Sequence, residues 1–271
     1  TQVLVATQAK LTAGAAARSI WKSVRNLDIY RLLIRANKHY QLQNADDYRT
    51  AFELVSRALE IEPDNVATNV WMAYVLKQRV LWGLGKDPAK DLTDARAFAE
   101  KALSLDPQSA SAHNLLGQLD MFAKNWDSAL THADKALEFA PGSGVDVGIA
   151  GLIKAWSGQP REGIEWLTRA MRLDPFHYPW VPSALAMTHN MVGQYEYARR
   201  LFIKLADSPI ESRYTRSDPL FGLAAVAVFE NDLEEARKFF ARALKQNPDV
   251  SLADFKPPLA ILRDRKFVAR L

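Results

Sequence analysis

Cysteine is missing from this sequence of 271 residues, so disulfide bonds and thiolate metal sites cannot form. Long apolar runs are missing too. The longest candidate, FGLAAVAVF at residues 221–229, has half of the roughly 18 residues that a membrane-spanning helix needs. The composition is still that of a folded protein, because 48% of the residues are hydrophobic and 24% are charged. We expect a protein without a membrane span, located in the cytoplasm.

Positive charge is concentrated at the two ends of the sequence. The net charge is +4, but residues 1–38 contribute +6 and residues 256–271 contribute +4, which leaves −6 for the middle. Basic ends beside an acidic middle could steer an anionic partner, and they equally fit ordinary solvated helix faces. No DNA-binding motif accompanies them, so nucleic acid is not an expected partner. The first residue is Thr1 rather than Met, from which we expect a piece of a longer chain.

What the sequence does contain is one seven-residue motif that occurs five times. Its copies are RALEIEP at 57–63, KALSLDP at 101–107, KALEFAP at 135–141, RAMRLDP at 169–175 and RALKQNP at 242–248. The prolines that close these motifs, together with Pro209, are separated by 44, 34, 34, 34 and 39 residues. A period in this range is typical of stacked repeats. Because proline blocks the continuation of a helix, each copy of the motif predicts the last two helical turns of a helix and the connection that follows it.

Small side chains recur at two places in each period. The first place is five residues before the proline and holds Ala58, Ala102, Ala136, Ala170 and Ala243. The second place is seven residues earlier and holds Ala51, Ala95, Ala129, Gly163 and Ala236. A small side chain allows a neighbouring helix to approach closely. We therefore expect pairs of antiparallel helices, each of which buries its apolar face on the next pair.

This pattern resembles the tetratricopeptide repeat, which has Leu-Gly in its first helix and an aromatic residue, two Ala and a closing Pro from its second helix onward. The best match is Leu116, Gly117, Trp126, Ala129, Ala136 and Pro141. The resemblance implies an all-α, right-handed superhelical solenoid. We expect about six helix hairpins, preceded by an N-terminal helical segment or connector (1–31) and followed by a C-terminal cap or tail (251–271). The hairpins are expected at residues 32–65, 66–109, 110–143, 144–177, 178–216 and 217–250.

Two units depart from the pattern. The second unit has ten extra residues around positions 80–90, which should extend its first helix or lengthen the turn, and Gly83, Gly85 and Pro88 favour an end of the helix there. The fifth unit has Leu205 where the later Ala is expected, and residues 208–218 after it predict a loop or a loosened joint in the stack.

Motifs for catalysis or metal binding are few. His113 and Asp120 could share a helix face, but two groups do not make a metal site. Gly148 has no place in the repeat pattern and costs a helix up to about 1 kcal/mol relative to Ala, so something is expected to approach its backbone. The acid pairs at 46–47 and 234–235 begin predicted second helices, where they complement the helix dipole. We predict no enzymatic activity and no cofactor.

The resemblance also implies a partner-binding groove. In this family four positions of each first helix point into the concave face. The candidates here are Tyr74, Asn114, Gln118, Met121, Leu152, Trp180, Met187, Asn190 and Phe221. The Lys and Asn with which chaperone-binding members hold a C-terminal carboxylate are absent as a pattern. The apolar candidates suit an amphipathic helix or an apolar peptide, although packing within the chain would also explain them.

Residues 12–25 predict a helix with Arg18, Lys22 and Arg25 on one face. This helix could cap the first repeat, occupy the groove or lead to another domain. The likeness extends more loosely to the repeat region that follows the catalytic domain in bacterial class III adenylate cyclase-like proteins, and to that of winged-helix regulators.

We therefore expect a protein–protein interaction or regulatory scaffold from a larger bacterial signalling protein, with a protein, a peptide or an attached domain as partner. The alternatives are the regulatory region of a cyclic-nucleotide cyclase polypeptide, a small-molecule or peptide receptor, and the arm of a nucleic-acid regulator.

Overall fold

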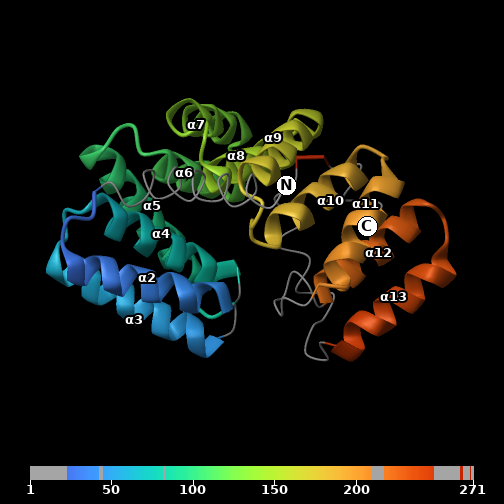
Figure 1. Ribbon diagram of the computed structural model, residues 1–271, viewed down its shortest axis with the longest axis horizontal. Helices are drawn as coiled ribbons and strands as arrows, with labels where there is room; N and C mark the ends of the chain where they lie inside the picture. Colours follow the sequence, from blue (N-terminus) through green and yellow to red (C-terminus); the bar gives the residue numbers. More distant parts are fainter. Residues whose placement is uncertain are drawn as a thin grey trace, which may run out of the picture.

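The computed structural model describes residues 23–42, 45–81, 83–208, 217–246, 263–264 and 269. These residues form twelve helices and no strand, which confirms the predicted all-α class. Figure 1 shows the helices following one another along a curved stack, from blue α2 to red-orange α13. The helices are α2 (Leu27–Leu42), α3 (Ala45–Ile61), α4 (Val66–Leu81), α5 (Pro88–Leu105), α6 (Ala110–Phe122), α7 (Trp126–Phe139), α8 (Gly144–Trp156), α9 (Pro160–Leu173), α10 (Trp180–Met191), α11 (Tyr195–Ala206), α12 (Ser217–Phe229) and α13 (Leu233–Gln246).

Each even-numbered helix pairs with the odd-numbered helix that follows it. The even-numbered helices also contact one another in series, from α2 to α4, α6, α8, α10 and α12. Among the described residues, the odd-numbered helices have no comparable contacts with one another. In a curved stack the closer series lies on the inner side, so the even-numbered helices line the inner face and the odd-numbered helices the outer face.

The small repeat positions are where the helices touch. All ten positions that the sequence fills with Ala or Gly are buried, as predicted. A Cβ on Gly163 would lie 2.6 Å from the Cβ of Ala155, and a Cβ on Gly117 would lie 2.9 Å from Cδ1 of Ile153. A larger side chain at Gly163 would force α8 and α9 apart, and one at Gly117 would displace the Ile153 side chain of α8.

The connections inside four hairpins share one geometry. Each is three residues long, at 123–125, 157–159, 192–194 and 230–232. The middle residue has a positive φ in every case: 62° at Lys124, 103° at Gly158, 79° at Gly193 and 65° at Asn231. The N–H of the third residue donates to a carbonyl five positions earlier, for example Asn125 N to Asp120 O at 2.8 Å. This bond satisfies a carbonyl at the end of the first helix, as expected of a left-handed C-terminal cap.

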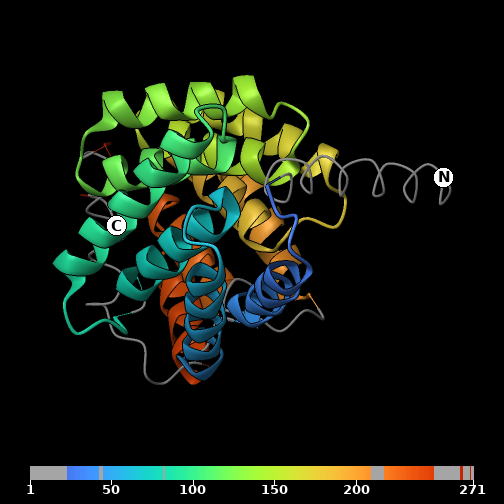
Figure 2. The ribbon, with the colours of Figure 1, turned by 90° about the vertical axis from the view of Figure 1, so that its left-hand side faces the viewer.

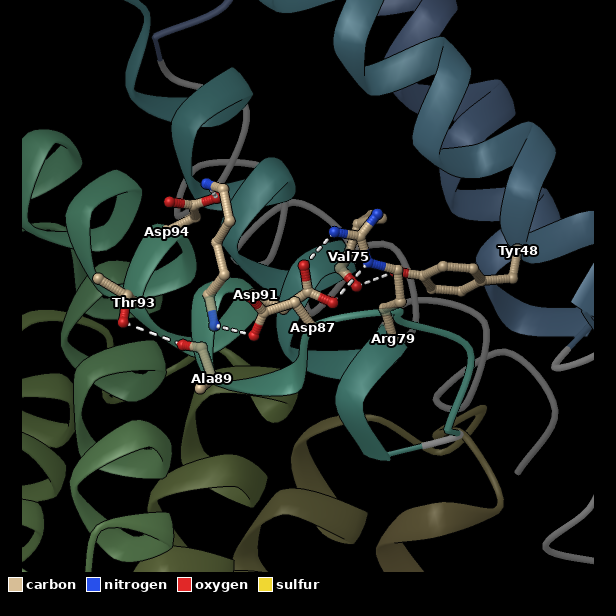
Figure 3. Close-up of polar contacts among 9 residues, drawn as sticks. Tyr48, Val75, Arg79, Asp87, Ala89, Asp91, Thr93 and Asp94 are labelled. Carbon is tan, nitrogen blue, oxygen red and sulfur yellow. Dashed lines mark hydrogen bonds and ion pairs between the residues drawn. The ribbon is translucent and has the colours of Figure 1, made fainter.

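The ten extra residues of the second unit are shared among three elements. Relative to the third unit, α4 is longer by three residues (16 against 13), the connection by three, and α5 by four (18 against 14). The sequence prediction was incomplete, because it placed the extra length in the first helix or the turn. Arg79 and Asp91 join the added turns through two hydrogen bonds, one of 2.8 Å from Nε to Oδ2 (Figure 3). Figure 3 also shows the Tyr48 hydroxyl donating to the carbonyl of Val75.

Ion pairs connect successive hairpins. Lys154 of α8 has a side chain that is 4% exposed, and its Nζ lies 2.6 Å from Asp134 of α7 and 2.9 Å from Glu162 of α9. Arg199 of α11 pairs with Glu235 of α13 at 2.7 Å. A buried cation needs nearby carboxylates. The Lys154–Asp134 and Arg199–Glu235 pairs fix the position of one hairpin relative to the next, whereas the Lys154–Glu162 pair joins the two helices of one hairpin.

Several predicted features lie mainly outside the described residues: the helix at 12–25, the loop at 208–218 and most of the tail at 251–271. Ser23 and Val24 are described, and they lie on the start of α4. Asn65 Nδ2 donates to the Ser23 carbonyl at 2.9 Å, the Ala67 N–H donates to Ser23 Oγ at 3.2 Å, and Val24 packs against the first core cluster. Among the described helices, none has the length and apolar character needed to cross a membrane.

Candidate partner-binding face

The nine candidate groove residues all lie on even-numbered helices, and they fall into two groups by burial. Asn114, Gln118, Met121 and Asn190 are buried. The half-buried ones are Tyr74, Leu152, Trp180, Met187 and Phe221. The inner face is therefore not uniform along the stack.

A polar array ties α4, α6 and α8 together at the inner face. Asn114 Nδ2 donates to the carbonyl of Asp146 at 3.1 Å, and Ser111 Oγ donates to Asp146 Oδ1 at 3.0 Å. Lys77 Nζ donates to Gln118 Oε1 at 2.6 Å. Because these bonds join consecutive units, the polar side chains hold the first half of the stack together.

Lys77 is the unusual member of this array. Its side chain is buried, and burial lowers its pKa from 10.5 to about 7. The ring of Tyr74 lies 5.2 Å from its Nζ, which favours the charged form. Burial also raises the pKa of Tyr74, with a smaller contribution from the charge of Asp146. A lysine in this setting changes its charge near neutral pH.

The burial of four candidates corrects the sequence analysis. Asn114, Met121 and Asn190 are exposed by 0%, 1% and 2%, and Gln118 by 7%, so they offer almost no surface to a partner in this conformation. The physical reason is the close approach of successive even-numbered helices, which turns these positions toward the chain itself. Neither amide atom of Asn190 has a hydrogen-bond partner within the described part of the chain.

The apolar candidates lie in the second half of the stack. Trp180 of α10 is half-buried, and its ring carbon Cη2 lies 3.1 Å from where a Cβ on Gly148 would be. The group that the sequence predicted to approach the backbone of Gly148 is thus the aromatic ring of Trp180. Met187 lies beside Trp156 against the buried Phe229.

Phe221 of α12 meets Phe240 of α13 edge to face, with ring centroids 5.5 Å apart. Together with Leu152, which is also half-buried, these side chains give α8, α10 and α12 partly exposed apolar surface.

The two histidines of the third hairpin form a pair. His113 Nδ1 lies 2.9 Å from His132 Nδ1, and His113 Nε2 lies 3.2 Å from the carbonyl of Pro107. Burial lowers the pKa of both rings. Asp120, on the same helix as His113, accepts from Arg96 at 2.5 Å and lies 3.8 Å from His132. Across the described ranges, no three His, Asp or Glu residues are placed to hold a metal ion.

Sequence models of the tetratricopeptide repeat match residues 89–146 and residues 218–250. The first range runs from α5 to the start of α8, and the second contains most of α12 and all of α13. The chain contains tetratricopeptide repeats. Tetratricopeptide repeats generally serve as non-catalytic scaffolds for protein binding.

Solved structures share the fold of this tetratricopeptide-repeat protein at low sequence identity. PilW, a widely conserved type IV pilus biogenesis factor, is 21% identical, with a TM-score of 0.58 over 86% of this chain and 99% of that one. PilF of Pseudomonas aeruginosa is 17% identical, with a TM-score of 0.53 over 86% and 97%. TTC0263 of Thermus thermophilus, a tetratricopeptide-repeat protein, is 18% identical, with a TM-score of 0.55 over 80% and 99%. A comparison with curated proteins gives no significant match.

Proposed function

We propose that this tetratricopeptide-repeat protein is an interaction scaffold that binds an amphipathic helix or another apolar peptide on α8, α10 and α12. The observation that carries the proposal is the partly exposed Trp180 on the inner face, with the partly exposed Leu152, Met187 and Phe221 on the same series of helices. Aromatic residues supply much of the affinity at protein interfaces, and methionine adapts to varied apolar partners.

The contrast between the two halves of the stack supports this location. In the first half the inner positions are occupied by the buried polar array around Lys77 and Asp146, whose donors are largely used within the chain. In the second half the candidate inner positions, apart from the buried Asn190, are apolar and partly exposed. An apolar partner gains most by covering surface that the chain itself leaves in water.

The test compares two tryptophan variants of the full chain. Displayed helical peptides are selected on the wild-type protein, and the affinity of a selected peptide is measured by calorimetry. Trp180→Ala should weaken binding by about 2 kcal/mol or more, the usual loss at an aromatic anchor. Trp166→Ala is the matched control, because Trp166 is half-buried on the outer helix α9. Equal affinities for Trp180→Ala and the wild type would refute the location.

The N-terminal segment is a second point to test. The contacts of Ser23 with Asn65 and Ala67 attach the described end of this segment to the start of α4. Deletion of residues 1–22 should lower the midpoint of thermal unfolding if the segment caps the first hairpin. Tighter peptide binding by a stable deletion variant would instead show that the segment competes with partners.

Signalling, a bacterial source, an attached cyclase domain, a cytoplasmic location and the division into six units remain predictions from the sequence.

A further inference from the structure

One residue near the end of the chain lies against the middle of the stack. The N–H of Arg263 donates to the carbonyl of Trp156 at 3.0 Å. Its Nη1 lies 3.1 Å from Oδ1 of Asp127 and 3.4 Å from the carbonyl of Ser157. Asp127 precedes Arg263 by 136 positions. In Figure 2 the short red segment near the C label lies beside the ends of green helices, away from α13.

The groups around Arg263 are those that recognise an arginine. The centre of its guanidinium group lies 5.6 Å from the centroid of the Trp126 ring, within the range of a cation–π contact. Asp127 supplies a carboxylate. The carbonyls of Trp156 and Ser157 come from the C-terminal end of α8, where the helix dipole favours a cation. Together these groups offer a ring face, a negative charge and oriented carbonyls, and a guanidinium group can use all three at once.

Gly158 leaves the room that the arginine uses. A Cβ on Gly158 would lie 2.9 Å from Cδ of Arg263, and the φ of Gly158 is 103°. Gly193 holds the same position in the turn between α10 and α11, with a φ of 79°, but a Cβ there would meet nothing closer than the Tyr195 hydroxyl at 4.0 Å. The repeated turn explains a residue with positive φ at both places, whereas the space beside Gly158 is filled by Arg263.

We propose that Trp126, Asp127 and the turn at 156–158 form an arginine-binding site on the edge of the stack, and that its resident ligand is Arg263 of the same chain. The site lies on the turns between paired helices and is distinct from the inner face, so it does not depend on the function proposed above. It holds Arg263 against the third and fourth hairpins. A free segment that carries an arginine in the same context competes with Arg263 for it.

The exposed fraction of each side chain determines how much its contact contributes to the binding of Arg263. The side chains of Asp127 and Arg263 are 91% and 45% exposed, so the ion pair alone contributes little in water. The ring contact and the Ser157 carbonyl must supply the selectivity for arginine, because the Trp156 carbonyl accepts from the backbone N–H of residue 263. Loss of the carboxylate should therefore weaken binding less than loss of the arginine.

The test is a binding titration with a labelled peptide of residues 257–269, PPLAILRDRKFVA. The full chain with Arg263→Ala should bind this peptide saturably. The wild-type chain should bind it about tenfold more weakly, because a tethered ligand competes at an effective concentration in the millimolar range. A peptide with Ala at position 263 keeps Arg265 and Lys266, and its affinity should fall at least tenfold. If both peptides bind equally, or neither binds, the site does not recognise Arg263.

Two further variants separate the site from general charge effects. Asp127→Asn in the Arg263→Ala chain should weaken peptide binding about threefold, whereas Glu138→Gln, an exposed acid on the same helix, should not. Gly158→Ala should abolish binding, and Gly193→Ala, which also places an alanine at a positive φ (79° against 103°), should leave it intact. Equal losses for the two glycine variants would mean that strain alone is responsible, and would overturn the proposal.

The intramolecular contact is tested by spin-label distances. The chain lacks cysteine, so Glu138→Cys and Ala269→Cys provide two unique labels on exposed residues. The wild-type background should give a narrow distance distribution that does not depend on protein concentration, and Arg263→Ala should broaden it. A distribution that narrows as concentration rises, together with a dimer in sedimentation, would show exchange between copies and refute the intramolecular assignment.

Discussion

The ring of Trp180 lies against the backbone of Gly148, with Cη2 of the indole 3.1 Å from where a glycine Cβ would stand. Glycine is unfavourable in the middle of a helix by up to about 1 kcal/mol relative to alanine. Its presence in α8 is explained by the close approach of α10, which carries Trp180, and of α9, because the same Cβ would also lie 3.4 Å from the Cβ of Ala170. Helices α8, α9 and α10 meet at this point.

The first prediction is that Gly148 and Trp180 are energetically coupled. In the Trp180→Ala background, Gly148→Ala should stabilise the protein by about 0.5–1 kcal/mol, since only helix propensity changes. In the wild type the indole opposes the new methyl group, so the gain should be smaller or reversed, with a coupling energy of about 0.5 kcal/mol or more. Urea unfolding of the four proteins gives this energy. Additive effects would show that the two side chains do not press on each other.

The second prediction concerns the small repeat position in α7. Ala136 is fully buried, so Ala136→Leu should overpack the contact between helices and lower stability by about 1–3 kcal/mol. Glu138→Leu, two residues along the same helix and exposed, should change stability by less than about 0.5 kcal/mol. Thermal unfolding of both variants checks this, and an unchanged midpoint for Ala136→Leu would contradict the register of the third hairpin.

The third prediction is a dependence of stability on pH that comes from Lys77. Burial lowers its pKa to about 7, below the 10.5 of a lysine in the unfolded chain. Between these values the unfolded state binds more protons, so stability should rise with pH by up to about 1.4 kcal/mol per unit. Below pH 7 both states are protonated, and the full cost of burying the charge remains.

Lys77→Met should remove this rise, although loss of the bond to Gln118 lowers its stability at every pH. Free energies of unfolding are measured between pH 7 and 9.5. The control is Lys135→Met, because Lys135 is exposed on α7, and its profile should follow that of the wild type. Parallel profiles for Lys77→Met and the wild type would show that Lys77 does not titrate in this range.

The fourth prediction concerns the turn between α6 and α7. Lys124 has a φ of 62°, a backbone conformation that costs most residues about 1–2 kcal/mol but suits Gly and Asn better. Asn231 holds the equivalent position in the last hairpin with a φ of 65°. Lys124→Asn should therefore stabilise the protein by up to about 1 kcal/mol. Lys135→Asn, inside a helix, should instead destabilise it by a few tenths of a kcal/mol. A lower unfolding midpoint for Lys124→Asn would be inconsistent with strain at this residue.

The repeat architecture could be predicted from the sequence because its determinants are local. Pro107 and Pro141 each follow the end of a helix, because proline cannot continue one, and Ala129 and Ala136 lie at helical spacing on one face. The same short pattern recurs, so each copy supports the others. Even the close approach to Gly148 followed from a local rule, since a glycine inside a helix is costly unless something needs the space.

The inner face and the tail required the tertiary structure. Whether Asn114 faces a partner or Asp146 depends on how closely α6 and α8 approach, and these two residues are 32 positions apart in the sequence. The return of Arg263 to Asp127 spans 136 positions and follows no repeat period. Local propensity sets which segments become helices, but burial and long-range hydrogen bonds depend on the summed packing of many units. For that reason the sequence by itself determined the helices and their pairing, and only the folded stack decided which side chains remain available for binding.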